Sequence, residues 1–432
     1  MNKFVLFFVF FSATLGWSQT EVWTLQRCFD QGMKNSLEAQ IKNLQVKKTQ
    51  KLHQPLALLW MPEVSLSGVQ SYNFGSTIDP ATNGRVSSNI QNDSFFLNAQ
   101  MNLLNFESLA SRARSGIEQK IAQADLAVFE SEYKLQILES YLQALFAQEL
   151  QAIQEEQFKN SQFNLERISK EVTLGSKPNS DLYDMQLSHA QEQIRLSETQ
   201  QLTALRKREL LQLISVDTVL PEKIALEKPQ SVESSLMSKT DFSSPKIIAA
   251  ELNLKASMAD RQRLRARNLP TLSTYYSAST FYYKPLNQPN VVVDDFHTQF
   301  KNNKNQQVGI QLYVPVFNGF RNNRSVSAAR IEEQKSKCAL EQAKRQLKNQ
   351  LDTEAQKKAN YEQLRPQFEQ VTKLAEASFK TSQAKFNSGK MDAVVFSSVK
   401  NQWLNAQYDH LKNQLMIQFT DFKIKLMQGQ TL

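Results

Sequence analysis

Histidine and cysteine are the side chains best suited to bind a metal or attack a substrate, and this chain of 432 residues has few of them. Its four histidines show no HExxH or related spacing: His53, His189, His297 and His410. The sequence also lacks a phosphate-binding loop and a GxSxG nucleophile elbow. We therefore expect no catalytic residue, no metal site and no cofactor, and we do not interpret the chain as an enzyme.

The two cysteines, Cys28 and Cys338, are isolated from each other and from the histidines. Neither lies in a CxxC motif, so we interpret them as structural thiols rather than metal ligands. A disulfide between them is the alternative in an oxidising compartment.

The first residues predict export. Lys3 precedes an apolar run over 4–11, and Gly16-Trp17-Ser18 fits a small-x-small cleavage pattern, so 1–18 is a predicted signal peptide. No later apolar run approaches the about 20 residues that a membrane-spanning helix needs. The net charge is +9, but Lys and Arg are dispersed among Glu and Gln along helical stretches. This distribution indicates a solvated helix surface and no nucleic-acid partner.

The mature chain is predicted to contain two repeats, over 19–214 and 243–432, joined by a linker over 215–242. Two stretches, which begin at Asn35 and Ser243, align without gaps and share the pairs Ser36/Ser244, Leu44/Leu252, Lys47/Lys255, Gln54/Gln262, Leu56/Leu264, Pro62/Pro270 and Ser65/Ser273. Each repeat also has the same order of elements: a helix, a strand, a polar loop, a strand, a very long helix, a glycine break and a last helix.

The elements follow from periodicity and from helix breakers. In the first repeat we expect a strand-loop-strand region over 63–104, a long helix over 108–174, a tip near Gly175 and a helix over 180–214. In the second we expect a helix over 245–268, a strand-loop-strand region over 271–317, a long helix over 321–387, a tip near Gly389 and a final helix. Each long helix would extend roughly 100 Å.

Prolines and short polar motifs predict the turns. Pro62 and Pro270 mark helix-to-strand turns, because proline disfavours the helical state in the residue before it. The strand-to-helix turns are expected at Asn105, Asn318 and Gly319. Pro366, inside the second long helix, predicts a bend or a short break.

The strand-like segments alternate apolar and polar residues. In the last of them, over 307–317, Val308, Ile310 and Leu312 alternate with Gly309 and Gln311. One apolar face over about 9–11 residues is typical of an outer-membrane strand, and a small soluble sheet packed on helices is the alternative. A barrel in lipid must close and needs about eight strands or more, so these strands predict a barrel shared between several copies.

These features resemble the outer-membrane efflux channel proteins of the TolC type. The resemblance covers essentially the whole mature chain and is carried by "LYVPVFNGF" over 312–320, "NLP" over 268–270, "LG" with "SDLYD" after the first long helix, and "NAQYDHL" in the last helix. It implies a mostly α-helical homotrimer with a small transmembrane β part. A long α-helical barrel would continue into a shared β-barrel of twelve strands in the outer membrane of a Gram-negative bacterium, with most of the chain in the periplasm.

The resemblance also implies a function and partners. Members form the passive exit duct of a tripartite efflux or type I secretion system. They contact outer-membrane lipid, a periplasmic adaptor (a membrane fusion protein) and an inner-membrane transporter of the RND or ABC type. The adaptor would dock at the tips, formed by Leu174, Gly175, Ser176, Ser388, Gly389 and Lys390. A soluble periplasmic coiled-coil scaffold or adaptor is the alternative, and it would explain the long helices but not the strands.

Aspartates near the tips are candidates for a pore constriction. The family often has aspartates six and nine residues after the second tip glycine, whereas this chain has Val395 and Ser398 there. The same spacing from Gly175 gives Asp181 and Asp184, three apart and on one helix face. Our hypothesis is that Asp181 and Asp184, with Asp392, form a negatively charged ring that favours cations. The alternative is that Asp181 stabilises a helix N-terminus.

Four arginines precede the second helix-to-strand turn at alternate positions: Arg261, Arg263, Arg265 and Arg267. One interpretation is contact with anionic lipid head groups. Since alternate residues do not share a helical face, an ordinary solvated surface is the other.

Overall fold

In this computed structural model, the structure describes residues 21–78, 83–87, 89–229, 244–286 and 292–430. The predicted signal peptide and the second half of the predicted linker lie outside the described residues. The chain divides into two compact units. We call them the helical unit (Met1–Asn43, Asp125–Ile247 and Ala343–Leu432) and the sheet unit (Leu44–Ala124 and Ile248–Gln342).

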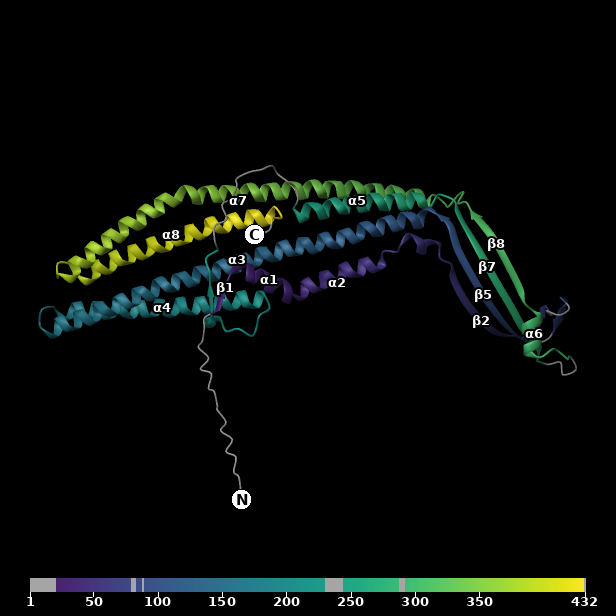
Figure 1. Cartoon of the computed structure of the whole chain (residues 1–432), viewed down its shortest axis with the longest axis horizontal. Helices are drawn as coiled ribbons and strands as arrows, with labels where there is room; N and C mark the ends of the chain where they lie inside the picture. Colours follow the sequence, from purple (N-terminus) through teal and green to yellow (C-terminus); the bar gives the residue numbers. More distant parts are fainter. Residues whose placement is uncertain (1–20, 79–82, 88, 230–243, 287–291, 431–432) are drawn as a thin grey trace, which may run out of the picture. The chain divides into compact units, whose positions relative to one another are not determined.

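The helical unit contains two antiparallel helical hairpins. One is formed by α3 (Phe106–Thr173) and α4 (Asn179–Leu213), and the other by α7 (Arg321–Asn387) and α8 (Ala393–Met427). Figure 1 shows that the two helices of each hairpin lie side by side. The first parts of α3 and α7 belong to the sheet unit.

Two apolar clusters pack these hairpins together. The central cluster includes Ile137, Leu138, Tyr141, Leu145, Leu210 and Leu415, all buried. The tip cluster consists of Ile168, Met185, Phe379, Phe386, Ala393, Phe396 and Trp403. Its rings stack closely, with the centroids of Phe386 and Phe396 4.5 Å apart and those of Phe379 and Trp403 also 4.5 Å apart. Narrow apolar seams on otherwise polar helices therefore produce a coiled-coil-like core.

A small parallel pair of strands lies against the central cluster. β1 (Glu21–Trp23) pairs with β6 (Ile224–Leu226), which follows the short helix η2 (Pro221–Lys223) inside the predicted linker. The Tyr141 hydroxyl lies 2.9 Å from the carbonyl oxygen of Trp23 and 2.6 Å from that of Glu227. The first half of the linker is therefore an ordered part of the helical unit.

The helix α1 (Leu25–Asn35) follows β1 and begins at Thr24, whose hydroxyl accepts a hydrogen bond from the backbone N–H of Arg27. Cys28 on this helix is fully buried, and burial raises the pKa of its thiol to about 12. Cys338 is exposed, and both cysteines are free. Cys28 is thus a packing residue, because its thiol stays protonated at neutral pH.

The sheet unit is built on a four-stranded antiparallel sheet in the order β2-β5-β7-β8 (Figure 1). These strands are Glu63–Asn73, Ile90–Asn105, Thr271–Pro285 and Asn305–Tyr313. The other elements are α2 (Leu37–Leu52), η1 (Leu56–Trp60), α5 (Pro245–Ala266), α6 (Phe296–Asn302) and the hairpin of β3 (Ser76–Ile78) and β4 (Arg85–Ser87). Each repeat supplies one pair of strands.

Two element ends and one helix interior differ from the predictions, each near a proline. α2 ends at Leu52 instead of reaching Met61, because Pro55 stops it and η1 follows. β8 ends at Tyr313 rather than at 317, since Pro315 has no N–H to donate to a sheet. By contrast, α7 continues through Pro366, so the predicted short break is absent from this described helix.

Candidate functional site

The four-stranded sheet has one apolar and one polar face. Opposite residues in antiparallel strands share a face, and the register pairs Leu66 with Leu97, Leu97 with Ala278, and Thr274 with Ile310. The apolar face consists of Val64, Leu66, Leu97, Ala99, Met101, Leu272, Tyr276, Ala278, Val308, Ile310 and Leu312. The opposite face, which we call the polar face, carries Ser65, Ser67, Asn98, Gln100, Asn102, Ser273, Ser277, Ser279, Gln307 and Gln311, and also the aromatic residues Phe96, Tyr275 and Phe281.

The apolar face is open to its surroundings rather than packed. Leu66, Val308 and Ile310 are 78%, 77% and 72% exposed. An exposed apolar patch of this extent is typical of a surface that meets lipid or another protein. Within the described chain, moreover, β2 and β8 each have a neighbour on only one edge. An open edge presents unpaired N–H and C=O groups, which invites pairing with another chain.

The predicted strand-to-helix turns lie where the sheet gives way to long helices. Asn105 ends β5, and its side-chain oxygen accepts a hydrogen bond from the N–H of Ser108 at 3.0 Å in the first turn of α3. Gly319, just before α7, has a φ of +64°, and Phe320 follows with a φ of +61°. Two successive left-handed residues reverse the chain sharply, and a glycine takes this conformation at little cost.

The two tips have the same backbone motif. Gly175 and Gly389 have φ values of +73° and +71°. At the first tip Gly175 N–H donates to Val172 and Ser176 N–H donates to Glu171; at the second, Gly389 donates to Phe386 and Lys390 to Lys385. This is the Schellman ending of a helix, which favours glycine at its left-handed position. Both predicted tips are thus helix ends, and Leu174 beside the first is 82% exposed.

Side chains of the first hairpin hold Phe386 of the second hairpin near the tips. The guanidinium of Arg167 lies 4.9 Å from the centre of the Phe386 ring, and Nζ of Lys177 lies 5.2 Å from it. Arg167 also donates a hydrogen bond to the carbonyl oxygen of Asn387 at 3.2 Å. These contacts fasten the hairpins to each other beside the tip cluster.

The three predicted constriction aspartates have different surroundings. Asp181 lies in the first turn of α4 and pairs with Lys177 at 3.2 Å, so its charge is partly compensated within the chain. Asp392 is the N-cap of α8 and accepts the N–H of Val395 at 2.8 Å. Asp184 is exposed. Two of the three thus have a local structural role, and the sequence motif alone did not separate them.

The arginine run is mostly an ion-pair network inside the sheet unit. Arg261 lies 3.0 Å from Glu333 on α7, and Arg267 lies 2.7 Å from Glu107 on α3. Arg263 also approaches Glu107, at 3.5 Å, whereas Arg265 is exposed. These arginines therefore join α5 to its neighbours, and of the two interpretations the structure gives lipid contact little support.

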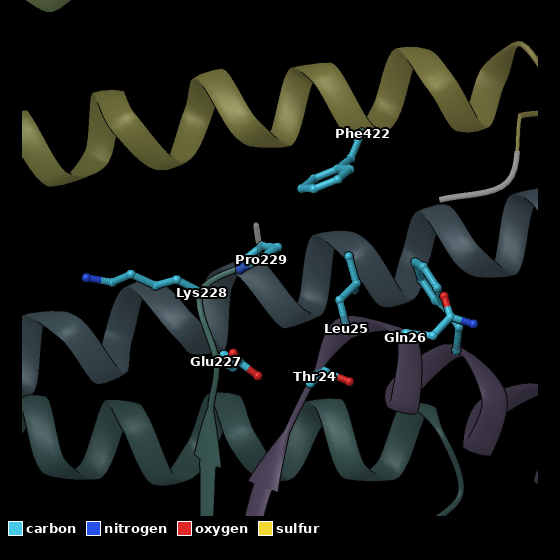
Figure 2. A pocket seen from close by; sticks show the side chains of 8 residues that line it. Thr24, Leu25, Gln26, Glu227, Lys228, Pro229 and Phe422 are labelled. Atoms are coloured by element: carbon cyan, nitrogen blue, oxygen red, sulfur yellow. The ribbon is translucent and has the colours of Figure 1, made fainter. Parts of the chain in front are cut away.

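A hollow in the helical unit lies beside β1 and β6 and has a volume of about 380 Å³. It is lined by Thr24, Leu25, Gln26, Phe29, Glu227, Lys228, Pro229 and Phe422. Figure 2 shows Phe422 of α8 and Leu25 of α1 pointing toward one another across it. Among the described residues, no group of three His, Cys, Asp or Glu side chains could hold a metal ion.

None of the helices in the described ranges is long and apolar enough to cross a membrane.

Comparison with known families and solved structures shows which proteins share this arrangement of long helical hairpins and a four-stranded sheet. Residues 236–423 match the family model described as outer membrane efflux protein. No curated protein matches the sequence.

Solved structures share the fold over most of the chain. CusC, described with transmembrane channel formation, superimposes with a TM-score of 0.79 at 15% identity, covering 94% of this chain and 92% of that one. The outer membrane protein VceC of Vibrio cholerae gives 0.75 at 14% identity, with 94% and 96% covered. The CmeC outer membrane channel of Campylobacter jejuni gives 0.75 at 13% identity, with 94% and 85% covered. Residues 236–423 thus match the outer membrane efflux protein family, and the chain shares the fold of outer-membrane channels over 94% of its length, in agreement with its resemblance to the TolC type.

Proposed function

We propose that three copies of this chain form a passive exit duct through the outer membrane. The sheet carries the proposal, because it has an exposed apolar face and two open edges in the described chain. Strands in lipid must satisfy every backbone group, so the free edge of β8 would pair with β2 of the next copy. Four strands from each of three copies close the twelve-stranded barrel that the resemblance implies. The polar face then lines the pore.

The helical unit supports the same assembly. Tyr183, Leu187 and Ile194 form an exposed apolar stripe along α4. On α7, Leu364, Val371 and Leu374 form another. Both stripes follow the spacings of three, four and seven residues that a helix uses to pack on a neighbour. Packing of α4 on α7 of an adjacent copy would continue the barrel as a helical tube in the periplasm. A soluble coiled-coil scaffold leaves the apolar face of the sheet without a role.

Efflux through such a duct needs a pump, and we place the docking of the periplasmic adaptor at the tips. The six predicted tip residues remain the candidates: Leu174, Gly175, Ser176, Ser388, Gly389 and Lys390. Exposure of the Leu174 side chain favours a hydrophobic contact there. Leu174→Asp should abolish export in cells while the purified channel keeps its conductance. Lys170→Asp, one helical turn earlier, is the control and should export normally.

The assembly is tested with a matched pair of neighbours on β8. Ile310 lies on the apolar face and Gln311 on the polar face. Lysine on the lipid side of a barrel costs about 2–4 kcal/mol at the bilayer midplane, whereas a pore-lining lysine is tolerated. Ile310→Lys should therefore reduce the heat-resistant trimer on unheated gels, and Gln311→Lys should leave it intact.

The unmodified protein should run as a trimer and conduct ions in planar bilayers. A monomer in mild detergent without conductance would refute the proposed function. Equal tolerance of lysine at both positions would refute the assignment of the two faces.

A further inference from the structure

The short helix α6 closes an edge of the sheet that β8 does not reach. β7 continues to Pro285, but its pairing with β8 ends at Ser279 opposite Asn305. Beyond that point the side-chain amide of Gln299 donates to the carbonyl oxygen of Tyr283 and accepts the N–H of the same residue, both at 3.0 Å. It thus satisfies the two backbone groups as a neighbouring strand would.

Two more hydrogen bonds fix α6 in this position. Asn303 donates through its side chain to the carbonyl oxygen of Phe281 at 2.9 Å, and the Thr280 hydroxyl donates to the carbonyl oxygen of Phe300 at 2.8 Å. Gln299 is only 6% exposed. Figure 1 shows α6 at the end of β7 and β8. The helix is therefore a built part of the sheet's rim.

α6 places aromatic rings on the apolar side of this rim. The Phe296 and Phe300 rings lie 6.1 and 5.5 Å from that of Phe95, and Phe296 lies 5.4 Å from Tyr282. Phe95 pairs with Thr280 in the register and shares the face of Leu97 and Ala278. Phe296 and Phe300 nevertheless remain 47% and 37% exposed. Aromatic rings in this position, next to an apolar band, are typical of a membrane interface.

Charged side chains surround the same helix. Lys284 at the end of β7, Lys301 in the last turn of α6, and Lys304 after it are all exposed. On the acidic side, Asp294 and Asp295 precede the helix, and the Asp295 carboxylate accepts the N–H of His297 at 3.0 Å as its N-cap. Three lysines beside exposed phenylalanines suit the surface of a lipid bilayer, where phosphate groups lie above the apolar acyl chains.

We propose that α6 is an interfacial anchor, which holds the outer rim of the barrel in an anionic, phosphate-bearing lipid surface. Phe296 and Phe300 enter the boundary of the acyl chains, and Lys284, Lys301 and Lys304 contact lipid phosphates. This inference rests on the proposed function, since it requires the apolar face of the sheet to meet lipid.

Spin labels on the full-length protein in vesicles test the anchor. Cys338→Ser removes the exposed thiol, and Cys28 is buried and does not label in the folded chain. Single cysteines are then introduced as His297→Cys on α6, Ile310→Cys on the apolar face and Leu174→Cys at the periplasmic tip. Collisions of each label with oxygen, which partitions into lipid, and with an aqueous nickel complex report its depth. The vesicles contain phosphatidylcholine alone or with phosphatidylglycerol.

We expect the label at 297 to lose most of the nickel accessibility that the label at 174 has, and to be shallower than the label at 310. Phosphatidylglycerol should deepen the position of 297, and the triple variant Lys284→Gln/Lys301→Gln/Lys304→Gln should lose that shift. Equal nickel accessibility at 297 and 174, with 310 in lipid, would overturn the anchor and leave the channel standing. A label at 310 that is itself open to nickel would instead overturn the proposed function. If the nickel accessibility at 297 were low but the same in vesicles with and without phosphatidylglycerol, the proposed phosphate contact would be wrong.

Discussion

Nζ of Lys400 on α8 lies 2.9 Å from Oε1 of Glu192 on α4, and the two side chains are only 5% and 4% exposed. This ion pair joins the two hairpins between the tip cluster and the central cluster. Arg195 adds a second link by donating to the side-chain oxygen of Asn401 at 3.1 Å. A buried pair contributes little net stability over an apolar pair, but one charge left alone in the interior is costly.

Lys400→Met should therefore lower the free energy of unfolding of the helical unit by up to about 3–5 kcal/mol, because the buried Glu192 would keep only Arg195, 3.7 Å away, as a cationic partner. The measurement is thermal unfolding in detergent followed by far-UV circular dichroism. Glu192→Leu combined with Lys400→Met should recover most of the loss. Lys380→Met is the control, since its pair with Glu376 is 70% and 43% exposed and should contribute about 1 kcal/mol or less. A double variant as unstable as the single one would contradict this account.

A second ion-pair contact joins α7 to α8, and acid should weaken it. Burial tends to raise the pKa of Asp421, but hydrogen bonds from Lys358 and Lys425, both 2.8 Å away, outweigh it, so that the pKa lies below its ordinary value of 3.8. A lowered pKa in the folded chain stabilises it above the unfolded pKa, and this contribution is lost as the pH falls through the folded pKa.

Asp421→Asn should accordingly destabilise the protein by roughly 1–3 kcal/mol at neutral pH, the usual range for hydrogen bonds to charged groups. The difference from the unmodified protein should shrink once the pH drops below about 4. Unfolding temperatures measured across this range check the prediction. A difference that persists unchanged in acid would mean that Asp421 acts through packing rather than charge.

The side chain of Tyr275 covers Gly309, so a substitution of this glycine tests how tightly the sheet is packed there. A Cβ atom at this position would lie 2.7 Å from Cζ of Tyr275, the residue opposite it on β7. Gly309→Ala should displace that ring and cost about 1–3 kcal/mol, seen as a lower dissociation temperature of the trimer. Gly68→Ala is the matched control, since its Cβ would meet the Phe95 ring at an ordinary 3.4 Å. If both alanines had the same effect, loss of glycine in a strand rather than crowding by Tyr275 would be responsible.

The sequence predicted the elements that have strong periodicity or a glycine break. The helices of both hairpins were expected because little in them breaks a helix, and the glycines at 175 and 389 end them in the structure as Schellman turns. The three residues of β6 carried no such signal. Their strand depends on partners in other elements: β1 pairs with it, and the side chains of Gln148 and Lys207 donate hydrogen bonds to the carbonyl oxygens of Leu226 and Ile224.

α6 was missed for a related reason. Its surroundings were interpreted as a polar loop, and seven residues are too few to show helical periodicity. Two local signals were present: Asp295 as an N-cap residue, and Phe296 and Phe300 spaced four apart on one helical face. These signals indicate a packed helix only once the register of β5 and β7 is known, because that register places Phe95 within reach of the Phe296 and Phe300 rings.

Negative charge at the periplasmic entrance should make the channel favour cations. Among the aspartates of the original hypothesis, Asp181 is paired with Lys177 and Asp392 caps α8, whereas Asp184 is exposed on α4. Threefold repetition of an exposed carboxylate would favour cations. Asp184→Asn should therefore shift the reversal potential of single channels in a salt gradient toward lower cation selectivity.

Asp181→Asn serves as the comparison for that measurement, because it removes a charge that Lys177 already offsets at 3.2 Å. It should change selectivity less than Asp184→Asn does and should loosen the start of α4 instead. Asp392→Asn keeps a side chain that can cap α8, so its effect isolates the charge from the cap. Unchanged selectivity in the variant with all three asparagines would show that the entrance charge lies elsewhere on the tube.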